Sequence, residues 1–301
     1  MGYKILISLF SKSKIKSKLI TLILVIIIFY FVTSILFFSV NIWDKTVTKF
    51  TVNKYFQEKN KLKTYLLDIK NLPTLKFPYI IKPIICSGTS RNVALINNDK
   101  DLNNYINNID KDEIYIIQQF YKSKYEIGVL YEKIPYLNDG NIISIVEKKN
   151  QTHQWKPLKC GNVKNDETTI CDNITKKFEN SKFSNIIREI SSKIPGFNAG
   201  RYDIGFENID DLNNGKFYIY ELNGVMGFDL RSNLTVNDNI SEIIKKTYYS
   251  LRWLSTRYLI GLLNLISLKI SPFNILNIYP NSIKNCIKCS DWEHLFHPSP
   301  C

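Results

Sequence analysis

The sequence predicts an α+β protein that is preceded by one membrane-spanning helix. Two observations carry this prediction. Residues 19–43 contain no charged side chain. Beyond them, short β-branched runs and hairpin turns are followed by amphipathic helical segments, twice over and without a βαβ series, which is typical of α+β layering. We therefore expect a basic N-terminal segment (1–18), a transmembrane helix (19–43), a stalk or linker (44–76), a main domain (77–245) and a C-terminal helix with a Cys/His-containing tail (246–301).

The apolar segment has the length and uniformity of a membrane span. Leu19–Val40 is almost wholly Leu, Ile, Val and Phe. A helix over residues 19–43 would be roughly 37 Å long at about 1.5 Å per residue, against a hydrocarbon core of about 30 Å. It shows no polar face, and no small-x-small cleavage site follows it, so a buried soluble helix and a signal peptide both fit poorly. We expect a single-pass membrane protein. Lysines flank both ends of the segment, so its orientation stays open.

Composition excludes some function classes. The chain has 301 residues, 40 Lys and Arg against 27 Asp and Glu, and a net charge of +13. Five of the lysines lie in the first 18 residues, and the others are dispersed among Asn and Asp. A nucleic-acid surface would show basic residues interleaved with aromatics, and none is seen. We expect no nucleic-acid partner, and a basic surface that attracts anionic substrates.

The remaining elements follow from periodicity and turn residues. A polar, Lys-rich helical stalk is expected over 45–70. A β-hairpin is expected around Asn138-Asp139-Gly140, and a second one around Asn213-Asn214-Gly215. The expected strands are 77–82, 93–96, 113–120, 125–134, 141–148, 201–206 and 216–221, and the expected helices are 99–108, 174–194 and 242–269.

The second hairpin carries the residues with the clearest chemistry. Side chains alternate faces along a strand, so Arg201 and Asp203 share a face, and so do Glu221 and Asn223. The hairpin places the two pairs opposite one another. Asp203, Glu221 and Asn223 then supply hard oxygen ligands of the kind that Mg²⁺, or Mn²⁺, takes together with phosphates. A cross-strand surface ion pair between Arg201 and Glu221, with no metal, is the alternative.

Two upstream stretches suit a nucleotide. Lys82 ends a predicted strand before a small, hydroxyl-rich loop, whose backbone N–H groups can cradle phosphates while the lysine supplies a charge. Further on, the amides of a buried strand can read an adenine edge, and the carboxylate of Glu126 can bind a ribose diol. The loop residues are Ser87, Gly88, Thr89 and Ser90, and the strand ends with Gln118, Gln119 and Phe120.

Taken in order, these motifs resemble the ATP-grasp superfamily. The resemblance covers about Phe77 to Asn233 and is greatest to the carboxylate–amine ligase branch, which includes the D-alanine–D-alanine ligase-like proteins. The matching motifs are the Lys-Pro strand with Lys82, the loop Ser87–Ser90, the hinge strand 118–120, Glu126, a strand bearing Lys148, Gly200-Arg201-Tyr202-Asp203 and Glu221-Leu222-Asn223.

The resemblance implies an ATP·Mg²⁺ site between two α+β subdomains. A substrate carboxylate would attack the γ-phosphate to give an acyl phosphate, which an amine or thiol then displaces. Lys148 and Arg201 would be the catalytic residues, and Gly224–Arg231 would line the acceptor pocket. Small-molecule or peptide carboxylates and amines are the implied substrates, with room for a partner chain that completes their site. ATP use favours a cytosolic domain, whereas the lysine bias mildly favours the opposite side. A nucleotide-binding membrane scaffold without turnover is the alternative.

Overall fold

The computed structural model describes most of the chain between residues 21 and 268. The described residues are 21–26, 28, 29, 32, 33, 35–37, 39–41, 50–70, 72, 73, 75–84, 92–110, 113–137, 139–150, 169–178, 181–225, 227–233 and 238–268. The expected basic segment 1–18, the loop Ser87–Ser90 and the C-terminal tail from 269 onward lie outside them.

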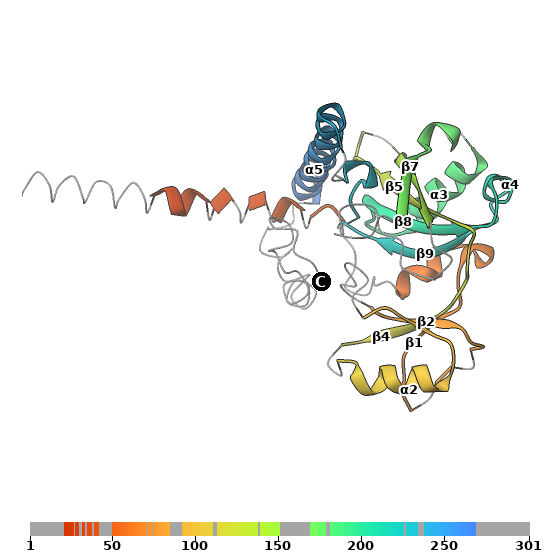
Figure 1. Ribbon diagram of the computed structural model, residues 1–301. Coiled ribbons are helices and arrows are strands. Elements are labelled where there is room, and N and C mark those ends of the chain that lie inside the picture. Colours follow the sequence, from red (N-terminus) through yellow and green to blue (C-terminus); the bar gives the residue numbers. More distant parts are fainter. Residues whose placement is uncertain are drawn as a thin grey trace, which may run out of the picture.

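The described part of the chain forms two antiparallel sheets, and each is covered by helix on one face (Figure 1). The smaller sheet has the order β1-β4-β2-β3 and the larger the order β7-β6-β5-β8-β9. This arrangement confirms the predicted α+β class. The smaller sheet consists of β1 (Thr64–Leu66), β2 (Tyr79–Pro83), β3 (Ala94–Ile96) and β4 (Tyr115–Gln119), with α2 (Asp99–Asn108) against it. The larger consists of β5 (Tyr125–Glu132), β6 (Asn141–Asn150), β7 (Thr169–Asn173), β8 (Ala199–Phe206) and β9 (Tyr218–Asn223), with α3 (Lys182–Lys193), α4 (Ile209–Asn213) and α5 (Ile240–Leu268).

The smaller sheet buries one face against α2. Alternate strand residues, Tyr79 and Ile81 of β2 and Ile117 of β4, form its core with Leu102 of α2. The helix begins where the Asn98 side chain accepts a hydrogen bond from the backbone of Asp101, which satisfies one of the open N–H groups of the first turn. The opposite face, with Lys82 and Gln118, is turned toward the larger sheet (Figure 1).

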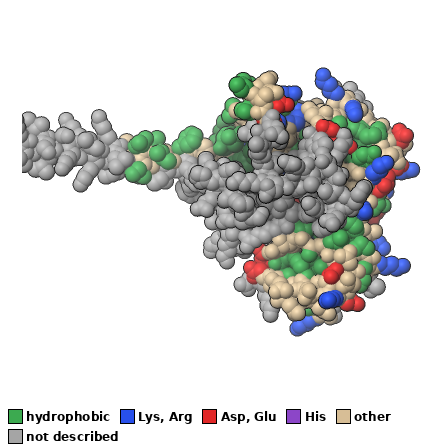
Figure 2. Space-filling model, viewed as in Figure 1, with side chains coloured by type: hydrophobic (Ala, Val, Ile, Leu, Met, Phe, Trp, Pro, Cys, Tyr) green, Lys and Arg blue, Asp and Glu red, His purple; other side chains and the backbone are tan. Residues whose placement is uncertain are grey.

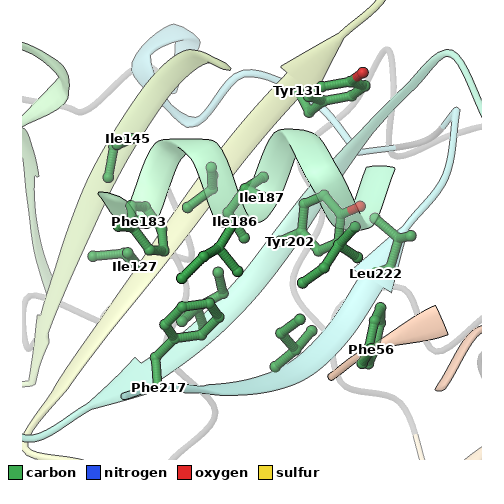
Figure 3. Close-up of a cluster of buried hydrophobic side chains, with 14 of the residues drawn as sticks. Phe56, Ile127, Tyr131, Ile145, Phe183, Ile186, Ile187, Tyr202, Phe217 and Leu222 are labelled. Carbon is green, nitrogen blue, oxygen red and sulfur yellow. The ribbon is translucent and has the colours of Figure 1, made fainter. Parts of the chain in front are cut away.

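The larger sheet buries its core on the face covered by α3. The apolar face of α3, with Phe183, Ile187 and Ile190, packs on alternate residues of β5 and β8 such as Ile127 and Tyr202 (Figure 3). Because strand side chains alternate, the residues between these core positions point to the other face. The packing of α3 thus determines which polar side chains face the smaller sheet.

The predicted helical stalk over 45–70 is wrong for its described part. The chain instead forms two short 3₁₀ helices, η1 (Thr51–Tyr55) and η2 (Glu58–Asn60), and then strand β1. Val52 and Phe56 are buried in the core of the larger sheet, and the amide of Asn60 donates to the carbonyls of Gly215 and Phe217. These long-range contacts outweigh the local helical preference. Strand β1 belongs to the smaller sheet, because it pairs with β4.

Both predicted strand pairs of the larger sheet are confirmed, with one difference in a connection. Strands β5 and β6 are antiparallel neighbours, and so are β8 and β9. The second pair is joined through the short helix α4 rather than by a tight turn alone. Gly215 ends this connection with a φ of 78°, in the left-handed region that glycine adopts without steric cost.

The C-terminal end of the predicted span 19–43 docks onto the domain, where Ser39, Val40 and Asn41 are buried. Asn264 of α5 donates to the carbonyls of Ser39 and Val40, and Asn41 accepts hydrogen bonds from the backbone of Asn198 and Ala199. Helix α5 is continuous, so the domain boundary expected at 245/246 falls inside it. The segment 19–43 is described only in part.

No helix among the described residues has both the length and the hydropathy needed to cross a membrane.

Basic side chains are dispersed on the face shown in Figure 2 and do not form a single stripe.

Candidate active site

A cluster of charged side chains occupies the face of the larger sheet opposite α3. Asp203 lies at its centre. Lys148 Nζ is 2.9 Å from Asp203 Oδ1 and 2.6 Å from Glu126 Oε1. Arg201 donates to both carboxylate oxygens of Asp203, each at 3.1 Å, and Asn223 Nδ2 donates to Asp203 Oδ2 at 2.9 Å. Asp203 therefore accepts four hydrogen bonds from three side chains, each on a different strand.

Lys82 brings the smaller sheet into the same site. Its Nζ donates to the backbone carbonyl of Tyr220 at 3.1 Å and lies 3.8 Å from Glu221 Oε2. The lysine side chain is 8% exposed. The two sheets thus meet through a charged side chain at the predicted phosphate-binding lysine. We call Lys82, Glu126, Lys148, Arg201, Asp203, Glu221 and Asn223 the central cluster.

Strand register explains why these residues meet. Glu126 is paired with Lys148, Arg201 with Asn223, and Asp203 with Glu221. The facing of Arg201 and Asp203 with Glu221 and Asn223 is the arrangement that alternation of side chains predicts for the second hairpin. A bulge between Asp203 and Ile204 adds one residue to β9, so that Ile219 and Leu222 both stay in the core while Tyr220 and Glu221 lie between them.

Two glycines allow the chain to pack closely around Arg201. A Cβ on Gly128 of β5 would lie 2.3 Å from the Leu230 side chain and 3.3 Å from that of Arg201. A Cβ on Gly227 would lie 2.6 Å from the backbone nitrogen of Arg201. The segment after Asn223 therefore lies directly against β8 at Arg201, which is where the predicted acceptor pocket begins.

The protonation states of the residues in the central cluster depend on one another. Burial by itself would raise the pKa of Asp203, but Arg201 and Lys148 outweigh it and hold that pKa well below its ordinary value. Burial would lower the pKa of Lys148, but Asp203 and Glu126 raise it above the ordinary value. Burial raises the pKa of Glu126, and Lys148 offsets this only in part. Asp203 is thus the firmly ionised carboxylate, and Glu126 is the more easily protonated one.

The alternative of a surface pair between Arg201 and Glu221 is wrong. Arg201 forms its ion pair with Asp203 on its own strand, and the side chains of Arg201 and Asp203 are only 13% and 14% exposed. Glu221 lies beside Lys82 from the other sheet. The charges are therefore shielded from solvent and joined in one cluster, which is the setting in which electrostatic effects on a reaction are large.

The predicted metal ligands are of the right type and lie on adjacent strands. Asp203 and Glu221 are paired across β8 and β9, and Asn223 points its amide nitrogen at Asp203. Two carboxylates and an amide oxygen suit Mg²⁺, which completes its octahedron with water and phosphate oxygens. Within the described part of the chain, no group of three or more His, Cys, Asp and Glu side chains is placed to hold a metal. The donor types are therefore those that Mg²⁺ takes.

The predicted adenine-binding strand lies at the connection between the two sheets. β4 ends at Gln119 in the smaller sheet, and β5 begins at Tyr125 in the larger one. Gln118 is buried and donates its amide to Thr64 Oγ1 at 3.1 Å, whereas Gln119 is exposed. Phe120 begins the connection itself. The structure thus directs Gln118 toward β1, an interaction that the sequence did not predict.

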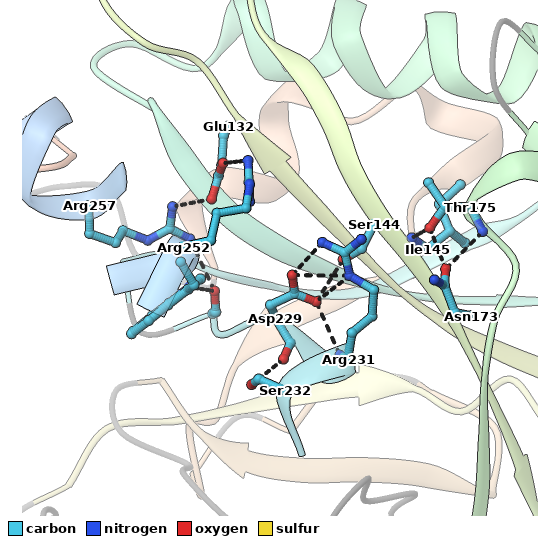
Figure 4. Close-up of polar contacts among 12 residues, drawn as sticks. Glu132, Ser144, Ile145, Asn173, Thr175, Asp229, Arg231, Ser232, Arg252 and Arg257 are labelled. Carbon is cyan, nitrogen blue, oxygen red and sulfur yellow. Dashed lines mark hydrogen bonds and ion pairs between the residues drawn. The ribbon is translucent and has the colours of Figure 1, made fainter. Parts of the chain in front are cut away.

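Sequence reasoning missed two buried ion groups beside the site (Figure 4). Asp229, which is fully buried, accepts hydrogen bonds from Arg231 and from Ser144 of β6. Glu132 at the end of β5 accepts hydrogen bonds from Arg252 and Arg257 of α5. Glu132 is 120 positions from Arg252 and 125 from Arg257, so no local pattern could have paired it with them.

No family model and no curated protein matches the chain. The solved structure of D-alanine–D-alanine ligase from Bacillus anthracis complexed with ATP is similar at 15% identity and a TM-score of 0.47, covering 71% of this chain and 66% of that one. A second structure of the B. anthracis ligase is 14% identical with a TM-score of 0.49, and the match covers 75% of this chain and 69% of that one. The Helicobacter pylori D-alanine–D-alanine ligase is 16% identical with a TM-score of 0.44, and the match covers 71% of this chain and 60% of that one. The chain thus spans 66% and 60% of the lengths of the first B. anthracis structure and the H. pylori ligase.

Proposed function

We propose that this chain is a membrane-anchored ligase that uses ATP to join a carboxylate to an amine or a thiol through an acyl phosphate. The observation that carries the proposal is the central cluster, which gathers three cations and three carboxylates between two sheets. Phosphoryl transfer depends on positioned cations and metal ligands rather than on a covalent nucleophile. The cluster supplies those groups, in the order along the chain that the ATP-grasp motifs have.

Each part of the predicted site has a role in this proposal. Lys82 and Lys148 neutralise phosphate oxygens, together with the loop 87–90. The strand end 118–120 and Glu126 hold the nucleoside. Lys82 supports this arrangement because its side chain crosses from the smaller sheet to the larger, so a nucleotide held there would contact both sheets.

The chemistry proceeds in two displacements. A carboxylate oxygen of the first substrate attacks the γ-phosphorus, the bond from that phosphorus to the bridging oxygen breaks, and ADP leaves. The nitrogen or sulfur of the second substrate then attacks the acyl carbon, loses its proton, and inorganic phosphate leaves. Arg201 stabilises the oxyanion formed in the second displacement. Asp203, Glu221 and Asn223 would hold Mg²⁺, which when bound offsets the negative charge of the phosphates.

The acceptor side of the site is formed by Gly224–Arg231 in this proposal. Phe228 supports this assignment, because its ring centre lies 5.1 Å from the guanidinium carbon of Arg201 and its side chain is 39% exposed. An exposed aromatic ring beside a buried cation suits a small molecule or peptide with a carboxylate. A partner chain that completes the substrate site is part of the proposal.

Replacing Lys82 with Met tests the phosphate assignment. Methionine keeps the length of the side chain and removes its charge. We expect the Kd for ATP to rise about 10- to 100-fold, since a hydrogen bond to a charged group contributes about 1.5–3 kcal/mol. The measurement is calorimetric titration of the full-length protein in detergent with Mg·ATP. The control is Lys216→Met, because the Lys216 side chain is 74% exposed and lies outside the cluster. Equal ATP affinities in the two variants would contradict the assignment.

Turnover separates a ligase from a scaffold. We expect release of inorganic phosphate from Mg·ATP to be stimulated by a particular pair of compounds, drawn from pools of amino acids, peptides and hydroxy acids. Stimulation by an acid alone would identify the carboxylate that forms the acyl phosphate. Nucleotide binding without stimulation by any pool would instead favour a nucleotide-binding membrane scaffold.

The anchor rests on the charge-free segment 19–43. Its described hydrophobic side chains from Leu22 to Phe29 are exposed, among them Ile26 (57%) and Phe29 (69%), whereas Ile35 and Val40 near its C-terminal end are buried. We expect the double substitution Ile26→Arg and Ile27→Arg to release the protein from membranes on carbonate extraction, because each central arginine costs about 2.5–3.5 kcal/mol on insertion scales. Ile114→Arg is the control, since Ile114 is 61% exposed in the smaller-sheet region. Retention of the double variant would contradict the anchor.

A further inference from the structure

Helix α5 carries a row of hydrophobic side chains on its exposed side, unlike an ordinary surface helix. Such a helix turns its apolar stripe to the core and its polar face to water. The buried positions among the described side chains of α5 are Arg257, Ile260, Gly261 and Asn264, so charged and polar groups share the buried side with one large hydrophobic residue. Apart from Ile243, its large exposed hydrophobic side chains recur at helical spacing along its whole length. With the exposed Ser255 they form the outer stripe, residues 240, 244, 248, 251, 255, 259, 262 and 266.

The outer stripe is continuous and uncharged. At 3.6 residues per turn its eight positions fall within an arc of about 100°. Leu251 is 62% exposed, Leu262 44% and Ile266 66%. None of the charged residues of α5 occupies a stripe position. Isolated exposed leucines are ordinary, but an apolar stripe along a 29-residue helix marks a surface that contacts something apolar.

The position of α5 identifies what it contacts. Its buried face is fastened to the C-terminal end of the charge-free segment: Asn264 donates to the carbonyls of Ser39 and Val40, and Gly261 fits against the backbone of Leu36 so closely that a Cβ would overlap it. Figure 1 shows α5 lying across the direction of the N-terminal helix, on the side of the domain from which that helix extends. In Figure 2, hydrophobic side chains gather on this edge of the molecule.

We propose that the outer stripe of α5 lies in the interfacial layer of the bilayer that the N-terminal segment enters. The proposal rests on the proposed anchor and goes beyond it, because it fixes which side of the domain faces the lipid. A helix of this kind buries its apolar face among headgroups and acyl chains, and basic flanks strengthen its binding to anionic lipid. The five lysines of residues 1–18 and Lys245 of α5 supply such charge.

The test is lipid quenching in the full-length protein. Its six native cysteines are replaced with serine, and one new cysteine carries a nitrobenzoxadiazole fluorophore. Leu251→Cys and Leu262→Cys probe the stripe. Ser250→Cys is the matched control, because Ser250 is exposed on the same helix but lies off the stripe. The proteins are reconstituted into phosphatidylcholine–phosphatidylglycerol vesicles with or without brominated acyl chains.

We expect a several-fold greater loss of fluorescence to brominated lipid at Leu251 and Leu262 than at Ser250. Equally weak quenching at all three positions would overturn the proposal. Disulfide cross-linking between two chains at Leu262→Cys, with no quenching, would overturn it in favour of a second copy on the stripe. Carbonate extraction of the same vesicles tests the anchor separately. If the protein resists extraction but the stripe positions are not quenched, the anchor stands and only the placement of α5 is overturned. ATP turnover tests the ligase proposal independently of both measurements.

Discussion

Replacing Asp203 with Asn should reduce ATP turnover by about 100- to 1000-fold, the range seen when one preorganised electrostatic contact is removed from an active site. The substitution keeps the size of the side chain. It removes the negative charge that accepts hydrogen bonds from Arg201 at 3.1 Å and from Lys148 at 2.9 Å. It also places an amide N–H₂ group, itself a donor, next to these donors. In the proposed site it also removes a metal ligand. Turnover of the full-length protein is measured with the substrate pair that the screen identifies.

The same variant should lose stability. Removing one partner from a buried pair costs about 3–5 kcal/mol, and we expect the lower end because the side chains of Arg201 and Asp203 retain 13% and 14% exposure. The effect should depend on pH. The folded-state pKa of Asp203 is lowered, so its stabilisation is complete above the unfolded value of about 3.9 and is lost as the pH falls toward the folded value. Urea unfolding at pH 7 and pH 3 measures this effect, and the difference in unfolding free energy between the wild-type protein and Asp203→Asn should be smaller at pH 3.

Asp210→Asn is the matched control, because Asp210 is an exposed carboxylate on α4 near the same strands. It should change neither turnover nor stability measurably. Lower stability of Asp203→Asn with unchanged turnover would mean that the central cluster is a structural ion group, and it would remove the main support for the ligase proposal.

The candidate site was predictable from sequence where strand alternation decides the geometry. Arg201, Asp203, Glu221 and Asn223 were expected on facing positions, and the register pairs them so. Alternation gives the face of a side chain but neither its rotamer nor its partner. The sequence therefore did not indicate that Arg201 forms its ion pair with Asp203 rather than with Glu221.

Contacts between distant segments account for most of what the sequence could not show. Asn60 reads as one more polar residue of a stalk, yet its amide donates to two carbonyls more than 150 positions away. The docking of Asn41 against Ala199 is equally remote in sequence, and the predicted span gave no sign of it. Local pattern predicts elements, whereas a buried polar side chain is explained only when its distant partner is known.

The largest loss of stability should come from Glu132→Gln. Glu132 is 3% exposed at the end of β5, and its carboxylate accepts hydrogen bonds from Arg257 at 3.1 Å and Arg252 at 2.9 Å. Burial lowers the pKa of Arg257 to about 10, so this guanidinium is still charged at neutral pH and its compensation comes from Glu132. Glutamine would leave a fully buried cation without its hydrogen-bonded carboxylate, at a cost of about 3–5 kcal/mol.

A series of variants keeps this prediction testable if Glu132→Gln does not fold. Arg257→Met removes the buried cation together with its hydrogen bond to the Gly227 carbonyl, and Arg252→Met removes a side chain that is 29% exposed. We expect the free energy of unfolding to fall most for Glu132→Gln, less for Arg257→Met and least for Arg252→Met. Glu189→Gln is the control, because Glu189 pairs with Lys193 on the exposed face of α3 and such pairs contribute about 0.3–0.5 kcal/mol.

The double variant Glu132→Gln with Arg257→Met decides whether the charge itself causes the loss. If an uncompensated cation dominates, removing both partners should destabilise the protein by less than the sum of the single losses. The effect should also reach the site, because Arg257 and Trp253 both donate to the carbonyl of Gly227, whose backbone lies against Arg201. Glu132→Gln should therefore raise the KM for the acceptor while the Kd for ATP is unchanged. Additive losses with an unchanged KM would show that α5 is packed on the domain without positioning this segment.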